Sequence, residues 1–308
     1  MRADIVVVTW HGRDVLASCL EHLLRQTERH RVIVVDNASH DGTAELVAER
    51  FPAVTFLELP ENRGFGAAVN AGAAAGDGDA IVLVNNDVDA DPGFVAALLE
   101  PLRSDPGVGM VAGMTLMPGR DAVDGYGIQL DRGLAAYGRL RHAPTDGGAE
   151  PGRLAGPSGG AAAYRRSAFD AVGGFDETLI AYGEDVDLLL RLRAAGWRAA
   201  GAPEARGVHL GGATIGVDSP LQQQLAGFAR GFLLRRWGVL RGRGALHALT
   251  IDALVVGWGV VRHRSLRQLR GRVAGWRAAG RGSRPLPPEA LDQTVGLTEA
   301  IRRLRSAR

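Results

Sequence analysis

The chain has 308 residues, 46% of them hydrophobic, which is enough apolar material for one large domain or a domain with an appendage. All 36 basic residues are arginine, and the formal net charge is +2. Cys19 is the only cysteine, which excludes an internal disulfide and favours a reducing compartment. Because the first apolar run follows directly on residues 2–4, we expect no signal peptide.

Strands and helices alternate through the first half of the chain. Short apolar runs bounded by polar turn residues predict buried strands, whereas leucines recurring on one side predict helices. This order of elements predicts a mostly parallel sheet with right-handed crossovers. The predicted strands are 5–9, 31–35, 54–58 and 80–84, and the predicted helices are 15–25, 43–50 and 66–75.

Two loops between these elements indicate a nucleotide site. Asp36 ends the second predicted strand, where a carboxylate can accept from a ribose hydroxyl or a base N–H. Arg63 and Gly64 precede the helix at 66–75, and a helix N-terminus beside an arginine suits a diphosphate. This loop lacks the third glycine of the dinucleotide fingerprint, which disfavours a nicotinamide-dependent oxidoreductase.

The strand at 80–84 is followed by Asn85, Asn86, Asp87 and Asp89. Ligands of open α/β sheets bind outside the carboxyl ends of the strands. Oxygen-rich clusters at such a position suit Mg²⁺ or Mn²⁺ with a phosphate ligand. The alternative is an ordinary polar turn, because asparagine and aspartate are common turn residues.

Residues 118–156 are rich in glycine, aspartate and proline and show little periodicity. We expect a loop-rich insert there that lies over the site and gates access of the donor. The glycine-rich segment 156–161 then precedes a short predicted strand at 162–164. Its glycines would let an acceptor approach the backbone closely, or they mark a turn.

Three carboxylates, Glu184, Asp185 and Asp187, begin a predicted helix whose apolar face is formed by leucines. Acids in a first turn are favoured by the helix dipole, so part of the cluster is explained by capping. A group that takes a proton from a hydroxyl also needs a carboxylate fixed at the end of an element. His209 is the first histidine after this helix.

The charge is distributed unevenly along the chain. Residues 1–229 hold 19 arginines and 30 acids, whereas residues 230–308 hold 17 arginines and 4 acids. Such a basic tail indicates an anionic partner, and the absence of a recognised motif disfavours nucleic acid. The aromatic and arginine mixture of 228–237 predicts an interfacial helix.

The apolar run 245–261 is barely long enough to span a bilayer, and Asp252 would be costly at its centre. We therefore favour contact with an anionic membrane surface. The alternatives are a helical cap on the first domain or a contact with a second copy, which would make a homodimer. A last amphipathic helix is predicted at 291–304.

Taken in order, these motifs resemble those of inverting glycosyltransferases of family 2, and especially their bacterial rhamnosyltransferase-like branch. The resemblance extends over about residues 3 to 215. It implies a GT-A type fold, in which a Rossmann-like nucleotide half is joined to an acceptor half. The motifs are Val-Val-Asp36-Asn-Ala-Ser39, Asn62-Arg-Gly64-Phe-Gly66, Leu83-Val-Asn-Asn-Asp87, Gly173-Gly-Phe-Asp-Glu177, Tyr182-Gly-Glu-Asp-Val-Asp-Leu188, Arg191-Leu-Arg193 and His209.

The resemblance assigns a role to each motif. Asp185 is implied as the general base, positioned by Glu184 and Asp187, and a divalent cation, Mg²⁺ or Mn²⁺, is implied as the cofactor. Asp87 matches the last acid of the family's Asp-x-Asp motif, whose first position is Asn85 here, so the cation would have fewer charged ligands. His209 is implied as a further metal or diphosphate ligand, and Asp89 lies outside the motif as a weak candidate. The implied donor-binding residues are Thr9, Asp36, Asn62, Arg63, Gly64, Asn85 and Asn86.

The sequence thus predicts an α/β protein of GT-A type with two parts. A glycosyltransferase domain would occupy 1–217, divided near 115 into nucleotide-sugar and acceptor halves, and a basic helical extension would occupy 218–308. The expected activity is transfer of a sugar, with rhamnose a candidate, from a nucleoside-diphosphate donor to a glycan or lipid-linked acceptor in envelope synthesis. It would take place in the cytoplasm, at the inner face of the plasma membrane. The alternative is a catalytically silent relative that serves as a membrane-surface scaffold.

Overall fold

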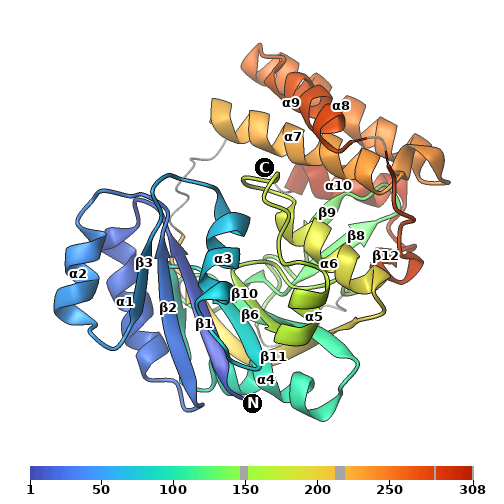
Figure 1. Cartoon of the computed structure of the whole chain (residues 1–308). Helices are drawn as coiled ribbons and strands as arrows, with labels where there is room; N and C mark the ends of the chain where they lie inside the picture. Colours follow the sequence, from blue (N-terminus) through green and yellow to red (C-terminus); the bar gives the residue numbers. More distant parts are fainter. Residues whose placement is uncertain (146–151, 212–218, 281, 307–308) are drawn as a thin grey trace.

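A computed structural model describes residues 1–145, 152–211, 219–280 and 282–306, with only the backbone of 304–306. Its centre is a nine-stranded mixed sheet of order β3-β2-β1-β4-β10-β6-β11-β5, with β7 paired to β6 (Figure 1). The mixed, mostly parallel sheet flanked by helices that the sequence predicts is confirmed. The predicted boundary between residues 217 and 218 lies outside the described residues.

The first half of the chain follows the predicted alternation closely. Strands β1 to β4 are parallel to one another, so their carboxyl ends meet at one edge of the sheet. The elements are β1 Ala3–Thr9, α1 Arg13–Leu24, β2 His30–Asp36, α2 Thr43–Arg50, β3 Thr55–Glu58, α3 Phe65–Ala74, β4 Ala80–Val84, β5 Val88–Ala90 and α4 Phe94–Ser104.

Alternate residues of the strands serve two separate cores on the two faces of the sheet. Ile5 and Val7 of β1 pack with α1, α2 and α4, whereas Val6 packs with α3 and the second half of the chain. This period of two is expected of a strand that is covered on both faces. The helices on both faces therefore hold the carboxyl ends of these strands in place.

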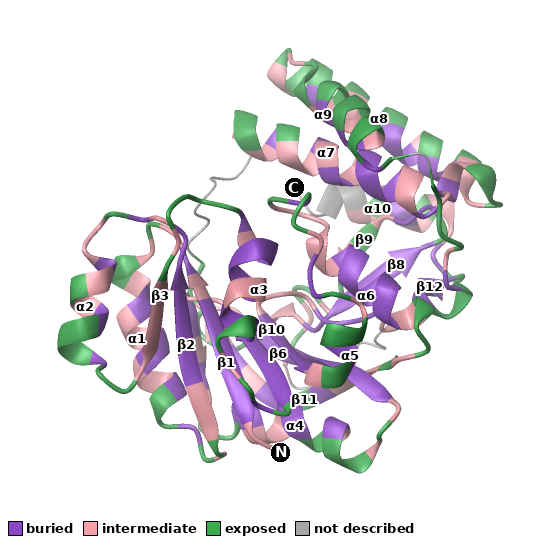
Figure 2. Cartoon of the chain, viewed as in Figure 1, coloured by how far each residue is buried: buried purple, intermediate pink, exposed green. Residues whose placement is uncertain are grey.

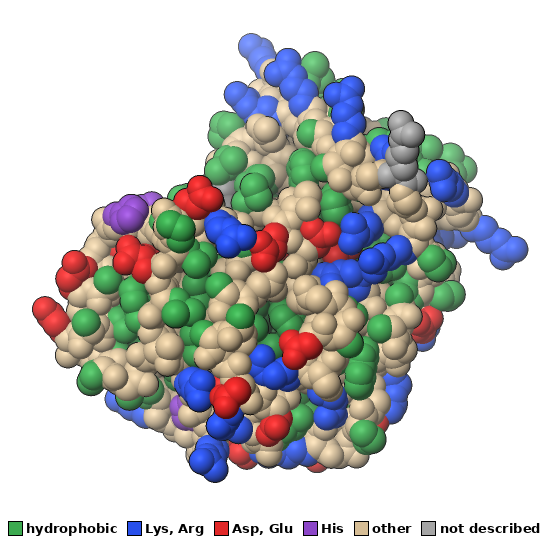
Figure 3. Space-filling model, viewed as in Figure 1, with side chains coloured by type: hydrophobic (Ala, Val, Ile, Leu, Met, Phe, Trp, Pro, Cys, Tyr) green, Lys and Arg blue, Asp and Glu red, His purple; other side chains and the backbone are tan. Residues whose placement is uncertain are grey.

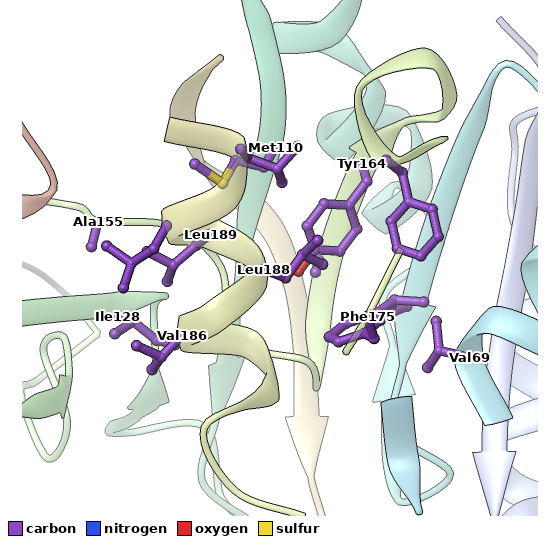
Figure 4. Close-up of a cluster of buried hydrophobic side chains, with 14 of the residues drawn as sticks. Val69, Met110, Ile128, Ala155, Tyr164, Phe175, Val186, Leu188 and Leu189 are labelled. Atoms are coloured by element: carbon purple, nitrogen blue, oxygen red, sulfur yellow. The ribbon is translucent and has the colours of Figure 1, made fainter. Parts of the chain in front are cut away.

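The second half of the chain adds β6 Val108–Leu116, β10 Ala161–Arg165, α5 Arg166–Ala171, α6 Glu184–Ala194 and β11 Arg198–His209. Strand β10 runs antiparallel to both β4 and β6, which brings α6 against the same face as α3. In Figure 4, Leu188 of α6 faces Tyr164 and Phe175, while Val186 and Leu189 lie toward Ile128 and Ala155. The leucines of α6 are inaccessible to solvent, so its acidic first turn is held firmly in place.

The segment 118–156, predicted to be a loop-rich insert, also has short strands. It contains β7 Val123–Gly125, β8 Ile128–Asp131 and β9 Ala136–Gly138, and its residues 146–151 lie outside the described part. Strands β8 and β9 form a small second sheet with β12 Leu291–Asp292. Each of these strands has only three or four residues, which is too short for a clear period of two, so the composition indicated loops.

The C-terminal region contains α7 Pro220–Arg236, α8 Ala245–His263, α9 Arg267–Ala278 and α10 Leu297–Ser306. The segment 228–237 does not present its aromatic residues at the surface, as an interfacial helix would. Phe232 and Trp237 are each 1% exposed and pack inward. The alternative of a helical cap on the first domain describes this segment. The last helix also begins later than predicted, because 291–292 form β12.

Helices α7 and α9 pack with almost no space between their backbones. A Cβ at Gly231 would lie 2.0 Å from the Arg272 carbonyl oxygen, and one at Gly275 would lie 1.9 Å from that of Phe228. Small residues at these positions let the two backbones approach closely. The helices are therefore locked together by shape as well as by apolar contact.

Replacing Gly231 with Ala is expected to destabilise the protein by about 1–3 kcal/mol, because the methyl group meets backbone that cannot move aside. Gly257 of α8 has no neighbour within 4 Å, so Gly257→Ala is the matched control. That control should be neutral or stabilising by up to about 1 kcal/mol. Chemical denaturation measures both, and equal effects of the two variants would contradict the packing described here.

Candidate active site

An open cleft of about 910 Å³ lies at the carboxyl ends of β1 and β4. One wall is polar and comes from the loops that follow the strands: Asn37, Asn62, Gly64, Asn85, Asn86 and Asp87. His209 lies beside Asp87 in this lining, which is completed by Tyr182 and Glu184 at the start of α6 and by Leu221, Gln222 and Leu225 of α7. Segments far apart in sequence therefore meet around one cavity.

The two predicted nucleotide loops are tied to each other. Asn37 donates from Nδ2 to the Gly64 carbonyl at 3.2 Å, and its Oδ1 accepts from the Arg63 N–H at 2.9 Å. Gly64 has φ of +86°, and a Cβ there would lie 2.3 Å from the Ile180 carbonyl oxygen. Glycine is thus required at this position, where the loop passes close to the segment before α6.

Two predicted donor-binding residues support the wall without lining it. Asp36 is 2% exposed and accepts hydrogen bonds from the backbone N–H and the hydroxyl of Ser39. Thr9 is 1% exposed and accepts a 3.1 Å hydrogen bond from Nδ2 of Asn86. Asn86 itself lines the cleft, so Thr9 holds it in place from behind.

Asp87 and His209 lie together although 122 positions separate them in the sequence. Strand β11 pairs with β5, placing Nε2 of His209 3.2 Å from Oδ1 of Asp87. The other ring nitrogen, Nδ1, lies 2.8 Å from Oδ2 of Asp124. The hydrogen bonds to Asp124 and Asp87 raise the pKa of His209 to about 10, and the bond to His209 lowers the pKa of Asp124.

Two of these three residues, Asp87 and His209, are placed to bind one divalent cation. Two neighbouring ligands of an octahedral Mg²⁺ or Mn²⁺, with bonds of about 2.1 Å, lie about 3.0 Å apart, close to the separation of Asp87 and His209. Asp124 would then hold the imidazole from behind, as carboxylates commonly do for metal-bound histidine. Among the described residues no group of three acids, histidines or cysteines forms a complete site, so further ligands would come from the substrate and water.

Glu184 and Asp185 stand at the N-terminus of α6, where Tyr182 and Gly183 both have positive φ and turn the chain sharply into the helix. Glu184 lines the cleft, and its Oε2 is buried without a hydrogen-bond partner among the described residues. Asp185 accepts a 2.7 Å hydrogen bond from the Val186 N–H. Burial raises the pKa of both carboxyls, and the charge of Asp185 raises that of Glu184 further.

Asp187 does not face the cleft. It is inaccessible to solvent, and Arg191 donates to its Oδ2 at 2.6 Å. The indole N–H of Trp237, at the end of α7, donates to its Oδ1 at 3.1 Å. Asp187 therefore joins α6 to the C-terminal helices and acts on the acidic turn only through the position of α6.

Two other predicted residues lie outside the cleft. Asp89 accepts a 2.8 Å hydrogen bond from Ser18 on α1, and Arg63 forms an exposed 2.6 Å ion pair with Glu177. Arg141, which sequence reasoning missed, lines the cleft instead. Neither Arg141 nor Asp124 belongs to a motif, and both come from the insert whose composition indicated loops.

The role of general base, which the family resemblance implies for Asp185, leads to a prediction for the pH profile. Burial raises this pKa to about 6, and a base acts only when deprotonated. Activity should therefore be complete above this value and fall about tenfold per pH unit below it, if one proton is involved. Measuring kcat/KM from acidic to neutral pH checks this, and a flat profile down to the ordinary carboxyl range would contradict it.

Comparisons with known proteins identify the family of the chain. The family model described as "Glycosyltransferase like family 2" matches residues 2–228. The chain is 35% identical over 243 residues to an N-acetylglucosaminyl-diphospho-decaprenol L-rhamnosyltransferase of Mycobacterium tuberculosis, covering 70% of this chain and 78% of that protein.

Two solved structures show the same fold. The mannosyltransferase PcManGT of Pyrobaculum calidifontis, in complex with GDP-Man and Mn²⁺, matches with a TM-score of 0.56 and 22% identity, covering 91% of this chain and 76% of that one. GalNAc-T7 with UDP, GalNAc and Mn²⁺ matches with a TM-score of 0.62 and 15% identity, covering 90% and 55%. The GT-A type fold that the motifs predict is confirmed.

Proposed function

The chain belongs to glycosyltransferase-like family 2 and is a glycosyltransferase, and on this premise we propose that it transfers a hexose with inversion from a nucleoside diphosphate to a lipid-linked acceptor. The observation that carries the proposal is one cleft that is lined both by the Asp87–His209 pair and by Glu184, the neighbour of Asp185 at the start of α6. Rhamnose is the first candidate sugar, because a relative with 35% identity is named as a rhamnosyltransferase.

The polar wall is proposed to hold the donor. Asn37, Asn62 and the loop backbone offer donors and acceptors to a nucleoside, and Asp87 with His209 would hold a divalent cation against its diphosphate. When bound, such a cation neutralises the charge that develops on a leaving diphosphate. Arg141 lines the same cleft and is the proposed protein cation for that group, in place of Arg63.

The start of α6 is proposed to activate the acceptor. In an inverting transfer the acceptor oxygen forms a bond to the anomeric carbon while the bond from that carbon to the diphosphate oxygen breaks. The hydroxyl proton passes to a carboxylate, for which we propose Asp185. The pKa of the neighbouring Glu184 is raised more than that of Asp185. Environments that move the pKa values of two carboxyl groups apart favour different roles for the two groups.

The cleft is also lined by apolar side chains, which suit an acceptor with an apolar part. Ile180, Leu210, Leu221 and Leu225 line it, and the first three are 40–51% exposed. The M. tuberculosis relative is named for an acceptor with a diphospho-decaprenol lipid. We therefore propose a lipid-linked glycan acceptor and a role in cell-envelope polysaccharide synthesis, at the cytoplasmic face of the plasma membrane.

Thermal unfolding with UDP, dTDP, GDP, CMP and NAD, each with and without Mn²⁺, tests the donor site. A ligand at about 100 times its Kd that binds only the folded protein adds roughly 2.7 kcal/mol to stability. We expect a shift that needs both Mn²⁺ and one nucleoside diphosphate. A shift with NAD alone would contradict the proposal, and no shift with any nucleotide would favour a silent scaffold protein.

A further inference from the structure

Helix α8 has an apolar face that is partly exposed to solvent. It is the one described helix long and apolar enough to cross a membrane by length and composition. Its inward residues, among them Ala248, Ile251 and Asp252, pack on the protein. The outward residues recur on one side of the helix, and the large ones are Leu246, Leu249, Leu254, Trp258, Val260 and Val261, which are 38–78% exposed.

Helix α9 continues this face. Leu266, Leu269 and Val273, at or within α9, are 43–48% exposed. We call these residues, together with the outward ones of α8, the hairpin face. In Figure 2 the outer sides of α8 and α9 are coloured mainly as exposed. Exposed apolar surface this extensive marks an interaction site in a soluble protein.

Arginines border the hairpin face and have no acidic partner among the described residues. Five of them are exposed: Arg262, Arg264, Arg267, Arg270 and Arg277. Between residues 245 and 280 the sequence has one acid, Asp252, and it is buried. Figure 3 shows arginine and hydrophobic side chains gathered over this part of the molecule. The surface is thus apolar and basic together.

The buried Asp252 determines which side of α8 faces the solvent. Asp252 accepts hydrogen bonds from Arg230 of α7 and Arg272 of α9 at 2.9–3.2 Å, so it ties the three helices together. Inserting α8 across a bilayer would break these pairs and leave a carboxylate in hydrocarbon, which is costly. The helix is therefore held against the protein with only its outer side available.

We propose that the hairpin face binds the surface of an anionic lipid bilayer, with its leucines and valines below the headgroups and its arginines at them. Long basic side chains and tryptophan suit this boundary, and arginines near the surface are attracted by anionic lipid. Charge complementarity selects the occupant, because in a dimer through this face the arginines of two copies would meet.

The hairpin face also determines how the cleft would lie relative to a bilayer. Helix α7 lines the cleft with Leu221 and Leu225 and packs on α9 through its glycines. A bilayer at the hairpin face would therefore be separated from these two leucines of the cleft by one helix. This last step rests on the proposed function, whereas binding to lipid does not.

Co-sedimentation of the full chain with vesicles, without donor or acceptor, tests the proposal. The vesicles are phosphatidylcholine alone or phosphatidylcholine with phosphatidylglycerol. We expect binding to the anionic vesicles that high salt weakens. Combined Arg264→Gln, Arg267→Gln and Arg270→Gln should lower the affinity by about 100-fold, at about fivefold per arginine. Combined Leu246→Ser, Leu249→Ser and Val261→Ser should lower binding to both kinds of vesicle.

The matched control is Leu24→Ser with Arg25→Gln and Arg29→Gln, an exposed apolar and basic group near the end of α1. It should bind as the unaltered protein does, and circular dichroism checks that every variant is folded. The proposal is overturned if the unaltered protein ignores anionic vesicles, or if the control loses as much binding as the two hairpin variants. It is also overturned if light scattering finds a dimer that the apolar variant dissociates.

Discussion

Replacing Asp185 with Asn is expected to reduce sugar transfer by roughly 10²–10⁴-fold, the usual contribution of a positioned general base. The amide has the same shape and can still accept the hydrogen bond from the Val186 N–H, so the turn into α6 should persist. Donor binding should persist as well, because the polar wall is untouched. A radiolabelled transfer assay measures the loss, and the thermal shift with nucleotide and Mn²⁺ reports on the donor site.

Glu184→Gln is the informative comparison, because Glu184 lines the cleft directly whereas Asp185 is not among its lining residues. We expect a clearly smaller loss of transfer for Glu184→Gln. If instead Glu184→Gln abolishes transfer and Asp185→Asn leaves it nearly intact, the two carboxylates exchange roles. A full rate in both variants would exclude proton transfer to this turn altogether.

Replacing Asp87 with Asn is expected to weaken metal-dependent nucleotide binding by at least about 100-fold, because loss of a charged ligand exceeds the effect of losing an outer partner. Asp87 is 6% exposed, so water has little access with which to compensate for the lost negative charge. The thermal shift with nucleoside diphosphate and Mn²⁺ should disappear, and transfer should fall with it. Calorimetric titration of Mn²⁺ in the presence of nucleotide measures the affinity directly.

Asp89→Asn is the matched control, since Asp89 has the same side chain two positions away but bonds to Ser18 outside the cleft. It should leave Mn²⁺ affinity unchanged. Asp124→Asn should be intermediate, at about 10–100-fold, because Asp124 acts through His209. Equal losses for Asp87→Asn and Asp89→Asn would show that net charge, not a ligand, governs metal binding.

The strands and helices nearest the cleft were predictable because their patterns are local. The five apolar residues 80–84 are a buried strand as predicted, and the helix at 43–50 has the predicted bounds. The position of the strand-end residues at the cleft could be predicted by the same reasoning, since parallel strands end at one edge of the sheet. Of the predicted site residues, Asn62, Gly64, Asn85, Asn86, Asp87, Glu184 and His209 line the cleft.

What was missed depends on contacts distant in sequence. Asp124 reaches His209 because β7 pairs with β6 and β6 pairs with the distant β11, and Arg141 reaches the cleft from the same insert. The buried face of α7 was missed for a related reason. Aromatic residues and arginines in alternation suit a lipid surface, but they equally suit a helix that buries Phe232 and bonds Arg230 to a partner.

The bond between Trp237 and Asp187 has a consequence for how such enzymes can be recombined. Asp187 lies two positions after Asp185 on the same helix, and its indole partner belongs to the C-terminal region. A chimera that exchanges residues after 218 between relatives would therefore leave Oδ1 of this buried carboxylate without its donor, unless the incoming segment supplies one. Sequence change in the C-terminal helices is thus constrained by a residue inside the acidic motif of α6, and the two regions must change in concert.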